Sequence, residues 1–114
     1  MMAPGVDGTL AALADSTRRG VVDLLRRRPR PAGELAAALE ITPPALSRHL
    51  RVLRRRGLIE EERDESDFRL RIYRLRPEPF AELQDWLRQV EGFWGEQLGS
   101  LQQHVERKKK ASRK

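Results

Sequence analysis

The chain has 114 residues and a formal net charge of +6, and it contains no cysteine. A chain of this length folds as one domain, and the lack of cysteine excludes disulfides, thiolate metal sites and cysteine nucleophiles. It has no apolar run long enough to cross a membrane and no secretory signal core, so we expect a cytoplasmic protein.

The excess positive charge is concentrated at the C-terminal end of the sequence. Residues 107–114 hold six basic residues and no acidic one, and the remaining residues comprise 17 of each sign. Net charge alone is therefore weak evidence for a nucleic-acid partner, and the local distribution of charge must carry that argument. We expect residues 1–106 to form the folded domain and residues 107–114 to be a disordered basic tail, because like charges repel.

Three short helices are expected before residue 40. The first covers residues 7–14 and is too short to be stable unless it docks on another element. The second begins at a cap formed by Asp15 or Ser16 and continues to Arg28, where two prolines end it. The third covers residues 32–39 and is rich in alanine, which allows a neighbouring helix to approach closely.

The strongest local signals surround a fourth helix at residues 43–56. Thr42 is a good N-cap, Pro43 is tolerated at the first helical position, and Gly57 supplies the left-handed residue that closes the last turn. Leucines at three- and four-residue spacing mark the side that faces a core. The other side carries small residues and then arginines, and the helix holds five arginines and no acidic residue. A charged face is often only solvated. Here, however, a short turn joins it to the helix at 32–39, and this helix-turn-helix order favours a DNA groove.

A β-hairpin is expected directly after this helix. Residues 58–63 have the composition of a strand, and residues 68–75 have the apolar–polar alternation of one. Residues 64–67 form the polar turn between them. The face taken by Tyr73 stays open, because the alternation falters there. Such a hairpin is the wing of a winged helix. Its turn carries three carboxylates, so either the tip tilts away from phosphates or its acids neutralise nearby arginines.

A long terminal helix is expected from Pro77 to about residue 105, with apolar residues repeating at three and four positions. A helix of about 28 residues is about 40 Å long, which is longer than this small domain covers. We therefore expect a second copy of the chain to bury the stripe, while the alternative is that the helix folds back on its own core. The predicted interface residues on this helix are Phe80, Leu83, Leu87, Val90, Phe93, Trp94, Leu98 and Leu101.

Several segments occur in a characteristic order, with a long terminal helix after them: LADSTRRGVVDLL (residues 13–25), AGELAAALEITPPALSRHLRVLRRRGLIEEERD (32–64) and YRLRPEPF (73–80). This order is similar to that of the arsenic-repressor-type (ArsR/SmtB) winged-helix transcription regulators. The resemblance implies a mainly α fold with a small hairpin wing, α-α-α-α-β-β-α. It also implies a bacterial homodimer that binds double-stranded DNA at an inverted-repeat operator and acts as a repressor. The first and last helices would form the dimer interface, which adds Leu10 and Leu13 to the predicted interface residues.

The resemblance assigns DNA contacts to the start of the fourth helix, where Ser47 and Arg48 match positions that read DNA in the family. By helical spacing, Arg51 fits a phosphate contact. His49 lies beside the leucine stripe, so we interpret it first as a packed, hydrogen-bonded residue and second as a DNA contact. The predicted DNA-binding residues are Thr42, Pro43, Pro44, Ser47, Arg48, Arg51, Arg55, Arg63, Arg69 and Arg71.

The sequence departs from the metal-sensing members of the family. Residues 34–39 contain no cysteine pair, Asp85 is not followed by the expected histidine, and His104 lacks its downstream partner. Two histidines in the whole chain cannot build the family's metal site. We therefore expect neither a metal nor a cofactor, and the tryptophan-containing terminal helix is more similar to that of the metal-free autorepressors.

Two other classes of function remain as alternatives. The chain could be a winged-helix protein–protein module whose long amphipathic helix binds a different partner. An enzyme is less well supported, because the sequence has no nucleophile–base pair, phosphate-binding glycine loop or metal cluster. Ser47 and His49 are two residues apart on a helix, so they do not face each other.

Overall fold

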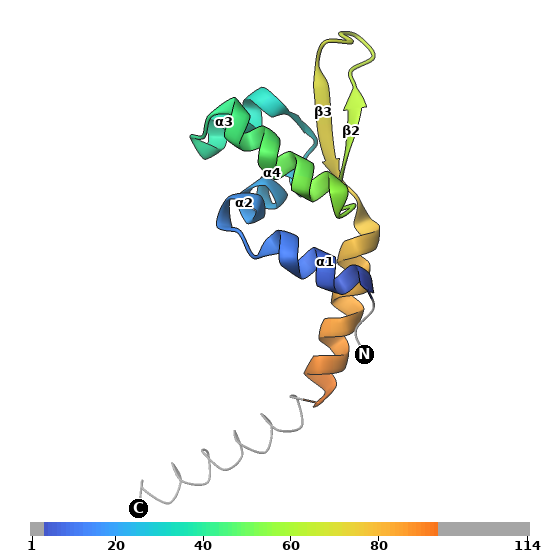
Figure 1. Cartoon of the computed structure of the whole chain (residues 1–114). Helices are drawn as coiled ribbons and strands as arrows, with labels where there is room; N and C mark the ends of the chain where they lie inside the picture. The colour runs from blue at the N-terminus through green and yellow to red at the C-terminus, as the bar shows by residue number, and fades with distance from the viewer. Residues whose placement is uncertain (1–3, 94–114) are drawn as a thin grey trace, which may run out of the picture. The chain divides into compact units, whose positions relative to one another are not determined.

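Figure 1 shows the computed structural model, which describes residues 4–93. The elements follow in the order α1 (Pro4–Leu13), α2 (Ser16–Leu25), β1 (Arg30–Pro31), α3 (Ala32–Leu39), α4 (Pro43–Arg55), β2 (Ile59–Arg63) and β3 (Arg71–Leu75). A further helix begins at residue 77 and is described to residue 93. The predicted fold class, mainly helical with a small β wing, is therefore confirmed.

The chain divides into two compact units, Met1–Leu83 and Gln84–Lys114. Helices α1 to α4, the sheet and the core all belong to the first unit. The predicted continuation of the terminal helix past residue 93 and the basic tail at residues 107–114 lie outside the described residues. The proposed division at residue 106 therefore stays a prediction.

Helix α1 begins earlier than the predicted helix at residues 7–14. Its buried side chains are Val6, Thr9 and Ala12, which recur every three residues. The Thr9 hydroxyl donates a 2.9 Å hydrogen bond to a backbone carbonyl one turn earlier, so this buried polar group is satisfied. Leu10, by contrast, is 37% exposed and leaves an apolar side chain on the surface of the helix.

Helix α2 begins where the sequence predicts and ends sooner. Asp15, rather than Ser16, is the N-cap, and its carboxylate accepts hydrogen bonds of 2.8 and 3.1 Å from two backbone N–H groups of the first turn. The helix ends at Leu25 instead of Arg28. Arg26 still has helical backbone angles, and Arg28 is disfavoured from the helical conformation because it precedes Pro29.

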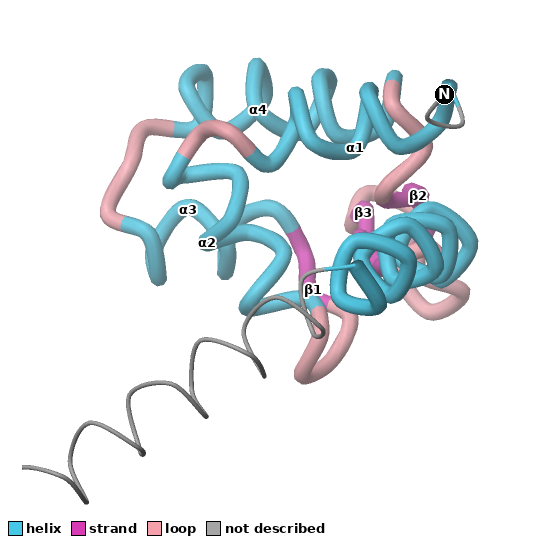
Figure 2. The backbone as a smooth tube through the Cα atoms, turned by 90° about the horizontal axis from the view of Figure 1, so that it is seen from below, coloured by secondary structure: helices cyan, strands magenta, loops and turns pink. Residues whose placement is uncertain are grey.

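A third strand, β1, was not predicted. It pairs antiparallel with β3, with Arg30 opposite Tyr73 and Pro31 opposite Ile72. Strand β3 therefore lies in the middle of the sheet, in the order β1-β3-β2, and Figure 2 marks these strands in magenta. The pairing ties the segment between α2 and α3 directly to the wing.

The second strand of the wing is shorter than predicted. It begins at residue 71 instead of 68, because Asp64 and Asp67 organise a turn with their own side chains. The Asp64 carboxylate accepts from the backbone of Ser66 at 2.8 Å, and that of Asp67 from the backbone of Arg69 at 3.0 Å. Such local bonds compete with strand pairing. The prediction that Phe68 belongs to a strand is therefore wrong, and its side chain is 70% exposed.

The core lies between the helices and the base of the sheet. Leucines from α4 provide its centre, as their spacing predicts, and the buried face of α4 meets α2, α3 and the start of β2. The open question of Tyr73 is answered, since only 6% of this residue is exposed. The buried residues of this core are Ala12, Val21, Leu25, Leu35, Ala36, Leu46, Leu50, Leu53, Leu58, Ile59 and Tyr73.

Helix α3 ends at a non-glycine residue with left-handed backbone, Glu40, whose φ is 55°. That conformation costs a residue with a Cβ about 1–2 kcal/mol. Glycine avoids this cost but destabilises the folded state by about 0.5–1 kcal/mol, because it loses more backbone freedom on folding. We expect Glu40→Gly to raise the free energy of unfolding by about 0.5–1 kcal/mol in urea titrations. Gly57→Ala, at φ 75° with open space around the new methyl group, should lower it. Changes of the same sign would contradict this account.

Candidate nucleic-acid interface

Helix α4 presents two different sides. The Thr42 hydroxyl caps it by accepting a 3.3 Å hydrogen bond from the backbone N–H of Ala45, and Pro43 occupies the first helical position. One side of the helix is buried in the core, as its leucines predict. The other side is open to solvent, and every residue on α4 or its cap that the sequence assigned to DNA is exposed: Thr42, Pro43, Pro44, Ser47, Arg48, Arg51 and Arg55.

A polar cluster holds α4 against the preceding helices. His49 Nδ1 lies 3.4 Å from a guanidinium nitrogen of Arg18 and 3.9 Å from the carboxylate of Asp15. Arg18 in turn donates a 2.6 Å hydrogen bond to the carbonyl of Ala12 at the end of α1. The backbone N–H of Arg18, together with the nearby His49, holds the pKa of Asp15 below its ordinary value. His49 is half-buried, which agrees with its interpretation as a packed, hydrogen-bonded residue.

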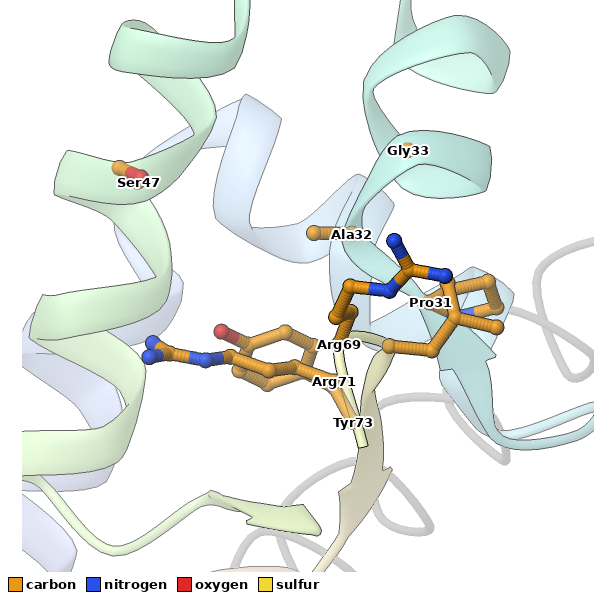
Figure 3. A pocket seen from close by; sticks show the side chains of 8 residues that line it. Pro31, Ala32, Gly33, Ser47, Arg69, Arg71 and Tyr73 are labelled. Atoms are coloured by element: carbon orange, nitrogen blue, oxygen red, sulfur yellow. The ribbon is translucent and has the colours of Figure 1, made fainter. Parts of the chain in front are cut away.

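Two pockets that share several residues lie beside α4 and the wing, and the larger one also reaches β1 and the start of α3. The larger, of about 300 Å³, is lined by Pro31, Ala32, Gly33, Ser47, Arg69, Leu70, Arg71 and Tyr73 (Figure 3). The smaller, of about 160 Å³, is lined by Ser47, Leu50, Arg51, Arg54, Arg71 and Tyr73. We call the two together the α4–wing groove. Ser47 and Arg51, which the sequence assigned to DNA, thus share this groove with wing residues.

A single carboxylate, that of Glu61 on β2, joins the two sides of the groove. It lies 2.8 Å from a guanidinium nitrogen of Arg54 on α4 and 3.3 Å from one of Arg71 on β3. The Tyr73 hydroxyl donates a 3.3 Å hydrogen bond to it. Burial, followed by the charge of Glu61, raises the pKa of Tyr73, so this hydroxyl keeps its proton and remains a donor at neutral pH.

Sequence reasoning missed Glu61, Arg54 and Tyr73 as members of the site. Glu61 stands directly opposite Tyr73 in the β2–β3 register, and facing residues of an antiparallel pair touch. A register could have been proposed from the hairpin, but the predicted second strand began at Phe68. Because that start is three residues too early, the sequence did not define which residues of the two strands face each other.

The wing arginines differ in their surroundings. The Arg69 guanidinium lies 3.4 Å from the carboxylate of Asp67, although its side chain is 94% exposed. Arg71 is held by Glu61, whereas Arg63 is exposed and has no ion pair among the interactions of the described residues. Of the acids in the turn, Asp67 thus pairs with Arg69, whereas the ion pair of Arg71 is with Glu61, outside the turn.

The residues expected at a dimer interface fall into three groups. Leu13 and Phe80 are partly buried against the chain's own core, and their place in a dimer interface stays a prediction. Leu10, Leu87 and Phe93 are 37%, 43% and 61% exposed. Leu83 and Val90 are half-buried. The remaining predicted residues, Trp94, Leu98 and Leu101, lie outside the described residues.

The described residues also bear on metals and membranes. Within residues 4–93, no three His, Asp or Glu side chains gather closely enough to hold a metal ion. Nor does that part of the chain include a helix of the length and apolarity that a membrane span requires.

Comparison with known proteins identifies relatives with a named role. The family model described as "Bacterial regulatory protein, arsR family" matches residues 15–61. The chain is 37% identical over 92 residues to HTH-type transcriptional regulator Rv2034 of Mycobacterium tuberculosis, which covers 76% of this chain and 83% of that protein. It is 33% identical over 58 residues to the transcriptional repressor SdpR of Bacillus subtilis, covering 51% of this chain and 64% of the repressor.

The fold comparison agrees with the sequence comparison. The crystal structure of an ArsR family transcriptional regulator, RHA00566, superimposes with a TM-score of 0.70 at 31% identity, covering 80% of this chain and 97% of that one. The sequence and fold comparisons thus indicate the same family, and the exposed arginine-bearing helix with the wing beside it is consistent with that family's fold. The chain therefore belongs to the ArsR family of winged helix-turn-helix, DNA-binding transcription regulators.

Proposed function

We propose that this protein is a repressor that binds an inverted-repeat operator as a homodimer and places α4 in the major groove. The observation that carries the proposal is the division of α4 into two sides. Its leucines are almost completely buried, while its small residues and Arg48, Arg51 and Arg55 are exposed together. A helix presented in this way has the shape and the donors that major-groove recognition requires.

In this proposal the residues of the interface have separate roles. Ser47 and Arg48, near the start of α4, contact base edges and supply specificity. Arg51 and Arg55, and the wing residues Arg63, Arg69 and Arg71, contact phosphates and fix the register. Because Arg69 is paired with Asp67, the wing adds less to affinity than three free arginines would.

The homodimer is supported by the apolar side chains that the described residues leave on their surface. Leu10 on α1 and Leu87 and Phe93 on the terminal helix are all exposed, and large apolar side chains are favoured at interfaces between subunits. A dimer would present two α4 helices about 34 Å apart, which is one turn of DNA. An operator with matching half-sites follows from this symmetry.

The experiment that tests the proposal is selection of bound duplexes from fragmented genomic DNA by the purified full chain. We expect an enriched inverted repeat, half-sites about one helical turn apart, and affinity that falls steeply with salt. Sedimentation of the complex should give two chains per duplex, and Leu10→Glu should weaken both dimerisation and operator binding. A protein that binds no duplex in a salt-dependent way, and instead forms a complex with a different protein, would favour the protein–protein module.

A further inference from the structure

The proposal concerns the Glu61 cluster, defined as Glu61, Arg54, Arg71 and Tyr73. Two guanidinium groups here share one carboxylate, at 2.8 and 3.3 Å. The Glu61 side chain is only 15% exposed, whereas those of Arg54 and Arg71 are 52% and 56% exposed. The cations thus reach solvent in the α4–wing groove while the anion that balances one of them lies beneath.

Each arginine keeps donors that Glu61 does not occupy. Arg54 approaches the carboxylate through one terminal nitrogen, Nη1, and Arg71 through Nε. Since a guanidinium group has five N–H donors in a fixed plane, each can bind a phosphate oxygen while still paired with Glu61. The hydrogen bond from buried Tyr73 fixes the carboxylate, and the carboxylate in turn limits the directions that both arginines can take.

We infer that Glu61 is a specificity-determining positioning residue, which neutralises one of the two arginines and orients both, so that binding to random DNA is suppressed relative to the operator. This inference rests on the proposed DNA-binding function. Non-specific affinity comes almost entirely from the number of phosphates that basic residues neutralise. An internal carboxylate lowers that number without removing the forked donors that a well-fitted operator uses.

The test compares Glu61→Gln with the wild-type full chain on two duplexes: the operator selected by the wild-type protein and a random sequence of equal length. We expect the variant to bind random DNA more tightly and with a steeper dependence on salt, by about 0.9 in the logarithmic slope for one additional phosphate. Between 50 and 200 mM salt this slope corresponds to an extra loss of affinity of about three- to fourfold. The operator gains less, so the ratio of operator to random affinity falls.

The chain offers a matched control on the neighbouring residue. Glu62 also pairs with an arginine, Arg74, at 3.0 Å. Successive residues of a strand point to opposite faces, so Glu62→Gln changes the charge equally but outside the Glu61 cluster. It should leave the salt slope and the affinity ratio at their wild-type values. The double variant Glu61→Gln/Arg71→Gln removes the arginine that Glu61→Gln releases, and it should restore the wild-type slope.

Different outcomes separate the inference from the proposed function. A folded Glu61→Gln that matches Glu62→Gln in slope and ratio overturns the inference while leaving operator binding intact. A wild-type protein without salt-dependent duplex binding rejects both. If Glu61→Gln does not fold, variants that retain Glu61 decide. Removing both arginines with Arg54→Gln/Arg71→Gln should reduce the slope for random DNA by about 0.9, no more than Arg55→Gln alone does. A reduction by about 1.8 overturns the inference.

Discussion

Replacing Leu53 by alanine is expected to lower the free energy of unfolding by about 2–5 kcal/mol. The Leu53 side chain is completely buried, and it belongs to the leucine row that joins α4 to the core. Truncation removes buried methyl groups and leaves a cavity that the rigid neighbours cannot fill. For a domain whose total stability is about 5–15 kcal/mol, this is a large fraction of the total.

Urea denaturation followed by circular dichroism measures this effect. Leu70→Ala is the matched control, because Leu70 is 43% exposed at the wing, and it should change stability by less than about 0.5 kcal/mol. A loss below about 1 kcal/mol for Leu53→Ala would mean that α4 is held to the domain by something other than its leucines.

Arg48→Ala is expected to weaken binding to the selected operator by about 1–3 kcal/mol and to relax specificity at the bases that it contacts. Arg48 is exposed on the outer side of α4, and an arginine can form two parallel hydrogen bonds with a guanine. Fluorescence anisotropy with operator and random duplexes at fixed salt measures the two affinities.

The control for Arg48 is Arg26→Ala, which removes another exposed arginine, paired with Asp23 at the end of α2. It should leave the affinity ratio unchanged. Equal weakening of operator and random DNA by Arg48→Ala would instead identify Arg48 as a phosphate contact, and Ser47 would then be the residue to test for base readout.

The parts of the fold that could be predicted are those whose signals are local. Thr42, Pro43 and Gly57 define the limits of α4 by capping and by backbone conformation, and each residue performs that role in the structure. The leucine spacing then defines the buried side. These features depend on residues within one or two turns of each other, so the sequence contains them directly.

The parts that escaped prediction depend on residues far apart in the chain. Strand β1 exists only because Arg30 and Pro31 meet β3 some forty residues later, and a two-residue strand has no periodicity to detect. The Glu61 cluster needs the hairpin register and the position of α4 together. At Phe68 the misleading signal was an alternation of apolar residues, which lost to the side-chain hydrogen bonds of the acidic turn.

The two outer strands of the sheet have a consequence for how copies of this chain can associate. Strand β1 is two residues long, and one of them is a proline that has no N–H to donate. Strand β2, at the other side, carries charged side chains at four of its five positions. Short length, proline and charge all discourage edge-to-edge β-augmentation and fibril-like aggregation. The edges of the described sheet are therefore poor surfaces for association, unlike the helices that carry the exposed side chains of Leu10, Leu87 and Phe93.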